Sequence, residues 1–252
     1  HTQRRRQRQM CIRDSVISQK NFKIKFMTKS FVHLHAHTEY SMLDGAAKIV
    51  DYLKKVKELN QPAAAITDHG NLYGAMEFVQ KANDFGIKPI IGYEAYITPG
   101  SRFDRPDREN NKRYHLTLLA ENNIGYQNLV ELVSKAYTEG YYYKPRIDYE
   151  LLDQHHDGLI ALSGCLGGEL AQHLAPDGSV EEGNTSNERS FEKALDIAKK
   201  YQSIFGKENY FIEIHNHGIK QQLDILDDLV EIAQLIDCLL YTSPSPRDGL
   251  GS

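Results

Sequence analysis

The chain of 252 residues contains 40% hydrophobic and 25% charged residues, a composition typical of a globular protein with one large domain or two small ones. No apolar stretch approaches about eighteen residues and no basic-then-apolar leader is present, so we expect no membrane span, no secretory signal and a cytoplasmic location. The net charge of −4 is uneven, because residues 1–15 carry +4, residues 238–252 carry zero and residues 16–237 therefore carry −8. An acidic body disfavours general polyanion binding, so nucleic acid would have to be contacted through local basic loops or bound metal.

The two ends of the chain differ in composition from the body. Residues 1–15 contain five arginines without apolar periodicity, and residues 238–252 become rich in Ser, Pro and Gly directly after a helical pattern. Both strings are typical of translated sequencing adapters, and we predict that both segments are non-native, which makes Met27 a candidate start. The alternative is a natural basic arm and a natural linker.

Between these ends, short apolar runs alternate with helical patterns. We predict strands over 31–37, 62–67, 88–97, 115–120, 158–164 and 210–218, and helices over 46–60, 72–86, 125–140, 188–206 and 219–237. This alternation favours a parallel α/β sheet with right-handed crossovers. Six strands are too few for a closed eight-stranded barrel, so we expect an incomplete α/β barrel whose last strands lie beyond Asp237. The alternative is an open doubly wound sheet, although no Gly-rich phosphate loop follows the first strand.

Three histidines share one face of the first predicted strand. His33, His35 and His37 alternate with apolar residues, so their side chains point the same way. Three imidazoles on one face are costly in a dry core unless they have partners. A single buried histidine is usually a hydrogen-bonded core residue, whereas two at positions i and i+2 near the end of a strand more often bind a metal.

Other potential metal ligands recur at the ends of the predicted strands. They are Asp44 just past the first strand, Asp68 and His69 after the second, Glu94 within the third, His115 at the start of the fourth and Cys165 after the fifth. Each residue alone has an ordinary interpretation as a helix cap, a turn former or a core filler. Carboxyl strand ends of an α/β barrel converge on one mouth, so together they predict a multinuclear metal site. Imidazole and thiolate ligands favour zinc or manganese over magnesium.

Two basic segments are candidate nucleic-acid contacts. The loop 101–114 carries Arg102 among five cationic residues, and YYYKPRID places Lys144 and Arg146 beside three tyrosines. Cations next to aromatic rings suit a single strand, through phosphate contact and base stacking. The alternative is a solvated loop with ion pairs inside the protein, which the interspersed acidic residues of the first loop support.

Six segments carry a family resemblance over about residues 31–237. They are HLHAHTEYSMLDGAAKI, AAITDHGNLYGAMEF, GIKPIIGYEAY, HLTLLAENNIGYQNLVELVSKAYTEG, KPRID and GLIALSGCLGGEL. Together they resemble the PHP (polymerase and histidinol phosphatase) domain of bacterial DNA polymerase III alpha subunits. The HxHT motif alone would indicate only the wider phosphoesterase superfamily, whereas the fourth and fifth segments point to the polymerase.

The resemblance implies a distorted (β/α)7 TIM-like barrel of the PHP type, truncated at its C-terminal end, which holds up to three divalent metal ions. By motif, it implies metal ligation by His35, His37, Asp44, His69, Glu94, His115 and Cys165, with Glu94 as the bridging carboxylate. The last Asp-x-His motif of the family is absent, so we expect two ligands to be missing. His33 matches no ligand and is interpreted as a buried, hydrogen-bonded neighbour, while His217 is placed beside the ligands and His215 has no assigned role.

The function implied by the resemblance is metal-dependent phosphodiester hydrolysis, since every visible ligand position keeps a metal-binding residue. We expect 3′→5′ exonuclease proofreading at a primer 3′ end, with Glu94, Asp68 and His217 as catalytic residues. The expected partners are DNA, the remainder of the polymerase chain and other replisome subunits. One alternative is a free-standing phosphatase that acts on a small phosphate monoester such as histidinol phosphate. The other is a structural domain whose metals stabilise the fold without turnover.

Overall fold

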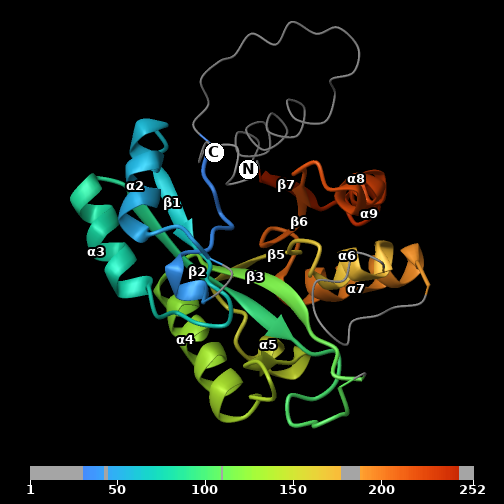
Figure 1. Cartoon of the computed structure of the whole chain (residues 1–252). Helices are drawn as coiled ribbons and strands as arrows, with labels where there is room; N and C mark the ends of the chain where they lie inside the picture. The colour runs from blue at the N-terminus through green and yellow to red at the C-terminus, as the bar shows by residue number, and fades with distance from the viewer. Residues whose placement is uncertain (1–30, 43–44, 109, 177–187, 244–252) are drawn as a thin grey trace, which may run out of the picture.

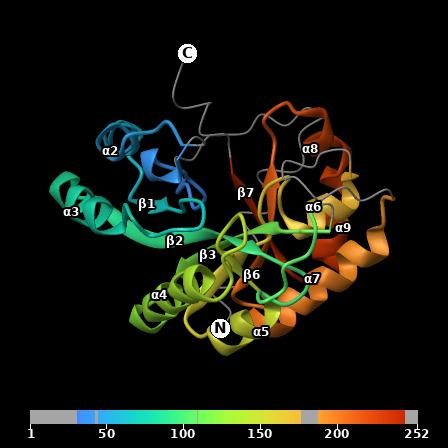
Figure 2. The same ribbon diagram turned by 60° about the horizontal axis from the view of Figure 1, so that its bottom comes forward.

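The computed structural model describes residues 31–42, 45–108, 110–176 and 188–243. These residues form one curled sheet with helices packed on its outer face (Figure 1, Figure 2). In chain order the elements are η1 Glu39–Ser41, α2 Ile49–Glu58, β1 Ala63–Ile66, α3 Ala75–Phe85, β2 Lys88–Ile97, β3 Tyr114–Ala120, α4 Asn123–Thr138, β4 Arg146–Ile147, α5 Tyr149–Gln154, β5 Leu159–Leu162, α6 Glu169–Leu174, α7 Phe191–Phe205, β6 Tyr210–His215, α8 Lys220–Asp224, α9 Leu226–Leu235 and β7 Leu239–Ser243. No helix within the described ranges is both long enough and apolar enough to cross a membrane.

The sheet has the strand order β1-β2-β3-β5-β6-β7, and the short strand β4 pairs with β2. The pairings are parallel except those of β3, which runs antiparallel to both β2 and β5. The predicted α/β class and barrel-like curl are therefore confirmed, but the prediction of an all-parallel sheet is wrong at β3. The described part of the loop 98–113, between β2 and β3, contains no helix. Without a helical crossover the chain simply turns back, so β3 runs opposite to its neighbours.

The segment 31–38 bridges the two edge strands β1 and β7. On one side, the carbonyls of His33 and Ala36 accept hydrogen bonds from the backbone N–H groups of Ala65 (3.2 Å) and Thr67 (2.9 Å). On the other side, the backbone N–H of Leu34 donates to the hydroxyl of Tyr241 at 2.9 Å. The predicted strand over 31–37 is not a regular strand, because Thr67 Oγ1 takes the N–H of Ala36 at 2.8 Å in place of a backbone carbonyl.

Strand β3 shows how the two faces of the sheet differ. Leu116 and Leu118 are fully buried against helix α4, where Leu129 and Leu132 pack on them. Burial of each leucine side chain contributes about 2 kcal/mol to folding. Because side chains alternate along a strand, His115 and Thr117 lie on the opposite, inner face. The outer face therefore holds the main hydrophobic core, whereas the inner face carries polar side chains such as His115 and Thr117 beside a smaller apolar cluster that includes Leu119 and Leu162.

Most predicted elements are present with shifted ends. The predicted helix over 219–237 is divided into α8 and α9, and the helix predicted over 72–86 ends where expected, at Gly86 in a left-handed conformation (φ 71°). Strand β7 lies inside the segment 238–252, which we predict to be non-native. It pairs in parallel with β6, with Phe211 opposite Leu239 at one end and His215 opposite Ser243 at the other. The non-native origin of both ends stays a prediction, and residues 1–15 lie outside the described residues.

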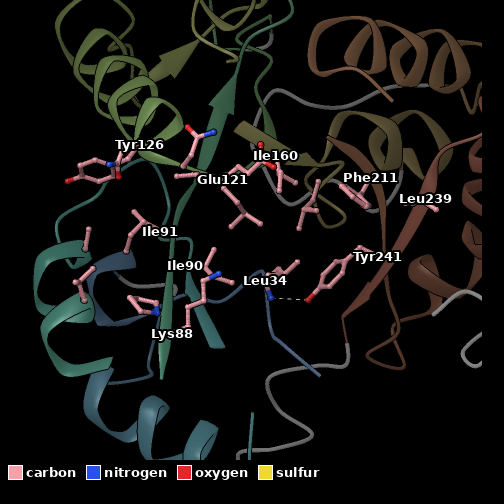
Figure 3. Close-up of a pocket in the computed structure, with 18 of the residues that line it drawn as sticks. Leu34, Lys88, Ile90, Ile91, Glu121, Tyr126, Ile160, Phe211, Leu239 and Tyr241 are labelled. Atoms are coloured by element: carbon pink, nitrogen blue, oxygen red, sulfur yellow. Dashed lines mark hydrogen bonds between the residues drawn. The ribbon is translucent and has the colours of Figure 1, made fainter. Parts of the chain in front are cut away.

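An apolar cavity of about 790 Å³ lies along the sheet (Figure 3). Its wall includes Leu34, Ile90, Ile160, Phe211 and Tyr241. None of the histidines described below lines this cavity. The polar site is therefore a separate feature of the inner face.

Candidate metal centre

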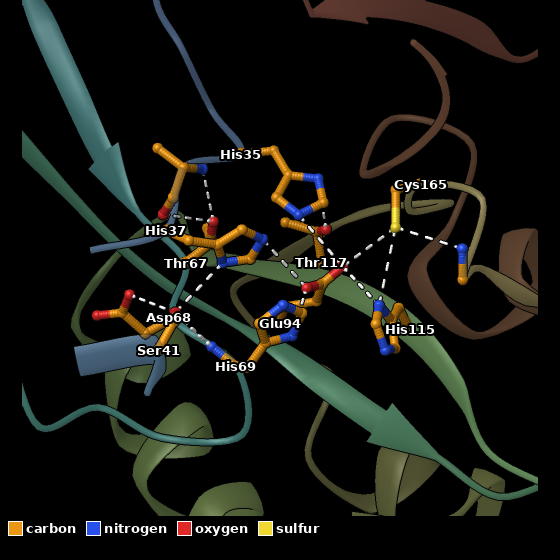
Figure 4. A network of polar contacts seen from close by, with 12 residues as sticks. His35, His37, Ser41, Thr67, Asp68, His69, Glu94, His115, Thr117 and Cys165 are labelled. Carbon is orange, nitrogen blue, oxygen red and sulfur yellow. Dashed lines mark hydrogen bonds and ion pairs between the residues drawn. The ribbon is translucent and has the colours of Figure 1, made fainter. Parts of the chain in front are cut away.

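Candidate ligand side chains from distant parts of the sequence converge on one another (Figure 4). His69 follows β1 and forms an isolated parallel bridge with Glu94 of β2. His115 opens β3, whose antiparallel direction brings its first residues to the same edge as the later residues of β2. The sequence-based argument expected carboxyl strand ends to converge, and for His115 the reversal of β3 produces the same result.

The carboxylate of Glu94 lies at the centre of four imidazoles and is fully buried. Its Oε1 atom lies 3.2 Å from His35 Nε2 and 3.3 Å from His115 Nδ1. Its Oε2 atom lies 3.3 Å from His37 Nε2 and 2.7 Å from His69 Nδ1. Two ligand atoms on one tetrahedral zinc ion, each about 2.0–2.1 Å from the metal, are separated by roughly 3.3 Å. Three of these four separations therefore match the distance expected between two ligand atoms that are bound to the same cation.

The donors divide into groups that could each hold one ion. His35, His37 and Glu94 form one group, and His69, Glu94 and His115 form a second, so Glu94 is common to both. A carboxylate with two oxygens can serve two ions, and the imidazole-rich donor set suits a divalent transition metal. The residues present therefore fit the divalent ions that the sequence predicted.

Cys165 lies at the edge of this cluster. Its Sγ atom is 3.8 Å from Glu94 Oε1 and 3.7 Å from His115 Nδ1, and it accepts a hydrogen bond from the N–H of Gly167 at 3.3 Å. The thiol is half-buried and free of any disulfide. This position is compatible with ligation beside His115, the arrangement expected from the sequence.

Burial and charge set the protonation of the cluster. Burial lowers the pKa of His37 to about 3, so its ring is neutral at pH 7 and keeps a lone pair for a metal. Burial also acts to raise the pKa of Glu94, but the surrounding imidazoles of His69, His115 and His35 hold it well below its ordinary value. The Glu94 carboxylate is thus an anion enclosed by imidazoles, a donor set that a divalent cation can complete.

Asp68 lies beside His69 and accepts hydrogen bonds from the η1 turn. Its Oδ1 atom accepts hydrogen bonds from the N–H of Thr38 (2.6 Å) and the hydroxyl of Ser41 (2.7 Å), and its Oδ2 atom accepts from the Thr38 hydroxyl (2.8 Å). The Ser41 hydroxyl oxygen in turn accepts the N–H of His69 at 3.1 Å. Asp68 therefore ties the η1 turn to the loop that carries His69, and its predicted catalytic role stays a prediction.

Two other residues singled out from the sequence, His33 and His217, lie outside the Glu94 cluster, and Asp44 is not among the described residues. The His217 ring lies beside that of His215, with 5.1 Å between centroids, and its backbone N–H donates to Gln222 Oε1. The Nδ1 atom of His33 is buried without a hydrogen bond within the described residues, so the expectation of a hydrogen-bonded neighbour is not confirmed for that atom.

Glu213 is a site residue that the sequence reasoning missed. It is buried on β6, with its carboxylate 3.0 and 3.1 Å from His35 Nδ1 and 2.8 Å from His215 Nε2. Burial acts to raise its pKa, but the imidazoles of His35 and His215 lower it to about 2. The signal was available, because Glu213 and His215 share one face of a strand in the same i, i+2 spacing as the first histidine pair.

The predicted nucleic-acid contacts need correction at two of three positions. Arg146 is fully buried and donates to the carbonyls of Gly140, Arg102 and Asp104, and Arg102 is paired with carboxylates including Asp148. Their burial contradicts the expected contact, because both guanidinium groups satisfy buried protein acceptors. Lys144 is half-buried, and its Nζ lies 3.2 Å from the hydroxyl of Tyr96. Its role as a DNA contact stays a prediction.

A curled α/β sheet with a buried carboxylate held among imidazoles at one end defines a metal-binding barrel protein. The profile of the PHP domain matches residues 33–217, and the chain belongs to the PHP domain family. It is 50% identical over 212 residues to the DNA polymerase III subunit alpha of Thermus aquaticus, covering 81% of this chain and 16% of that protein. It is 47% identical over 205 residues to the subunit of the same name from Treponema pallidum (strain Nichols), again 81% of this chain and 16% of the relative. The chain thus spans about a sixth of the length of these relatives.

Proposed function

We propose that this chain is the PHP domain of a replicative DNA polymerase III alpha subunit and that it hydrolyses phosphodiester bonds with divalent metal ions. The specific reaction we propose is 3′→5′ exonuclease trimming of a primer 3′ end. The observation that carries the proposal is the position of Glu94, whose two carboxylate oxygens each face two imidazoles. The identity to polymerase subunits supports the choice of DNA as the substrate.

Glu94 is suited to bridge two cations, with His35 and His37 holding one and His69 and His115 the other. Two cations about 3.5–4 Å apart would supply an activated water and stabilise the attacking and leaving oxygens of an in-line displacement. Cys165 can add a thiolate beside His115. Imidazole and thiolate ligands favour zinc or manganese over magnesium. A third ion could complete the site, as the family resemblance implies.

We propose that Lys144 contacts the phosphate of the substrate. Its Nζ lies 3.2 Å from the hydroxyl of Tyr96, and the Tyr96 ring lies 5.9 Å from that of His69 and 5.3 Å from that of His115. A cation one aromatic ring away from the metal ligands can contact a phosphate that is bound at the metals. We therefore propose the primer 3′ end as the partner at this side, and the remainder of the polymerase chain and other replisome subunits, in the cytoplasm, as the other partners.

The test compares Glu94→Gln with wild type on a 3′-mismatched DNA primer in the presence of zinc or manganese. Loss of at least about a hundredfold in trimming rate is expected, since the bridging charge is removed while the side-chain volume is kept. The control is Lys199→Gln, because Lys199 is exposed and, among the described residues, its one ion pair is with Asp196 on its own helix. Equal trimming by all three proteins would favour the structural-domain alternative. Hydrolysis of histidinol phosphate without primer trimming would favour the free-standing phosphatase.

A further inference from the structure

The imidazole of His35 is held between two buried carboxylates that face its two nitrogens. Nε2 lies 3.2 Å from Glu94 Oε1, inside the metal cluster, whereas Nδ1 lies 3.0 and 3.1 Å from the two oxygens of Glu213. The His35 residue is 5% exposed, so no solvent competes for either nitrogen. Nε2 of this ring therefore faces the candidate metal cluster, whereas Nδ1 faces a carboxylate outside the Glu94 cluster.

A neutral imidazole has one N–H donor and one lone pair, and its environment decides which nitrogen has which. An ionised carboxylate only accepts, so Nδ1 facing Glu213 must carry the hydrogen. When a cation lies between Nε2 and Glu94, the ring carries one hydrogen only, so the lone pair is left on Nε2 and is directed at the cation. The opposite tautomer would place a lone pair against the Glu213 carboxylate and a hydrogen where the metal binds. Thr117 Oγ1, 3.2 Å from the same Nδ1, can accept as well and does not oppose this assignment.

Glu213 is itself fixed in position. The N–H of Glu213 donates to Ser163 Oγ at 2.9 Å, and its Oε1 atom lies 2.8 Å from His215 Nε2. Strand β6, which carries it, is paired on both sides, by β5 and β7. A buried carboxylate with this support has little freedom to turn away from His35.

We propose that Glu213 is a positioning residue of the metal centre, which orients the His35 ring and keeps its Nε2 lone pair directed at the metal. Histidine ligands commonly donate their second N–H to a carboxylate, and loss of that carboxylate typically lowers metal affinity about 10–100-fold. The competing arrangement is a separate ion held by His35, Glu213 and His215, whose donor atoms also lie close together. The two arrangements differ in what they predict for the number of bound ions. The proposal requires metal binding but does not depend on hydrolysis.

The experiment measures zinc affinity by chelator competition and zinc content at saturation, for the full chain. Glu213→Met removes the acceptor at similar length and is expected to weaken the tightest zinc site about 10–100-fold without changing the number of ions at saturation. Glu213→Gln keeps an oxygen acceptor and is expected to lose less. The matched control is Glu169→Met, since Glu169 is another buried glutamate, 5% exposed, hydrogen-bonded to tyrosines rather than to histidines. It should reduce stability but leave zinc affinity unchanged.

Three results would overturn the proposal: unchanged affinity in both Glu213 variants, equal losses in both, or one fewer ion at saturation. The last result would make Glu213 a ligand in its own right. A second measurement needs no change at Glu213. In ¹⁵N-histidine NMR of the zinc-loaded wild type, the signals assigned by their loss in His35→Gln should show a protonated Nδ1. A protonated Nε2 on His35 would refute the assignment even if the Glu213 variants failed to fold.

Discussion

The Nδ1 atom of His115, the second residue of β3, lies 3.3 Å from Oε1 of Glu94, the seventh residue of β2. The two strands are antiparallel neighbours, and Glu94 is paired with Thr117 in their register. A cation held by Glu94 and His115 would therefore link the two strands across their pairing. Bound metal should contribute to the stability of the fold as well as to any chemistry.

Removal of metal is expected to lower the melting temperature of the chain. An ion that binds only the folded state at a hundred times its dissociation constant adds about 2.7 kcal/mol, which is roughly 5–10 °C for a domain of this size. The measurement is thermal unfolding followed by circular dichroism, before and after dialysis against a chelator. Zinc or manganese should restore the transition, and magnesium should restore it less. An unchanged transition would show that the cluster is not occupied in the folded protein.

Arg146 and Lys144 should respond in opposite ways to neutralisation. Arg146→Met leaves the carbonyls of Gly140, Arg102 and Asp104 without a buried donor, so the free energy of unfolding should fall by about 3 kcal/mol. Lys144→Met should change stability by less than about 1 kcal/mol but weaken binding of single-stranded DNA. Urea denaturation and fluorescence anisotropy with a labelled oligonucleotide measure the two quantities. If Lys144→Met binds the oligonucleotide as tightly as wild type, Lys144 is not a DNA contact.

Glu169 should give the stability of the chain a pH dependence that a glutamine lacks. Burial raises the pKa of Glu169 above its ordinary value of 4.5, although the hydroxyls of Tyr149 and Tyr201 and the charge of Lys200 act against the rise. Between the ordinary and the raised pKa the folded state binds more protons than the unfolded state, so stability falls as pH rises. Relative to wild type, Glu169→Gln should therefore gain stability as pH rises through this window.

The comparison for Glu169 uses urea unfolding of both proteins from about pH 4 to about pH 7. Because both proteins contain the same metal ligands, the pH dependence of metal binding cancels in the difference. A difference that stays constant over this range, or that changes in favour of wild type, would contradict the prediction.

Asp68→Asn is expected to lower the free energy of unfolding of the chain more than it lowers the rate of primer trimming. The Asp68 carboxylate accepts three hydrogen bonds from Thr38 and Ser41, and an amide can accept on only one of its two terminal atoms. A loss of about 1–3 kcal/mol in the free energy of unfolding is expected. Chemical denaturation gives this value, and zinc analysis should show an unchanged number of ions. If stability is retained but primer trimming is abolished, the catalytic assignment of Asp68 is supported instead.

The sequence predicted the clustering of the candidate ligands better than it predicted the directions of the strands. Alternation within FVHLHAH and the Thr-Asp-His pattern placed His35, His37 and His69 together, and the structure brings them around Glu94. The direction of β3 was missed, although no helix was predicted between the strands at 88–97 and 115–120, and a connection without a helical crossover favours antiparallel pairing. His115 was nevertheless placed correctly, because the antiparallel turn and the expected strand-end rule lead to the same edge.

Local composition did not predict which side chains are buried where their burial depends on contacts with residues far away in the sequence. Lys144 and Arg146 are two residues apart in one motif, yet only Arg146 is fully buried, with acceptors contributed by loops some forty residues away. Glu213 was missed for a different reason, because its pairing with His35 spans 178 residues. The Glu-x-His spacing on β6 nevertheless indicates a polar pair on one strand face, as the His-x-His spacing does for His35 and His37.

The bridging segment 31–38 has a consequence for the order of folding. It joins β1 to β7 through contacts such as that of Leu34 with Tyr241, 207 residues apart, and it carries two of the candidate ligands. Closing so long a loop is entropically costly and slow. The pairing of segment 31–38 with β7 should therefore form late, after the strands from β1 to β6 have assembled. The contact of His35 with Glu213 spans 178 residues and depends on the same late step. We therefore expect full metal affinity at His35 to be reached only once segment 31–38 has paired with β7.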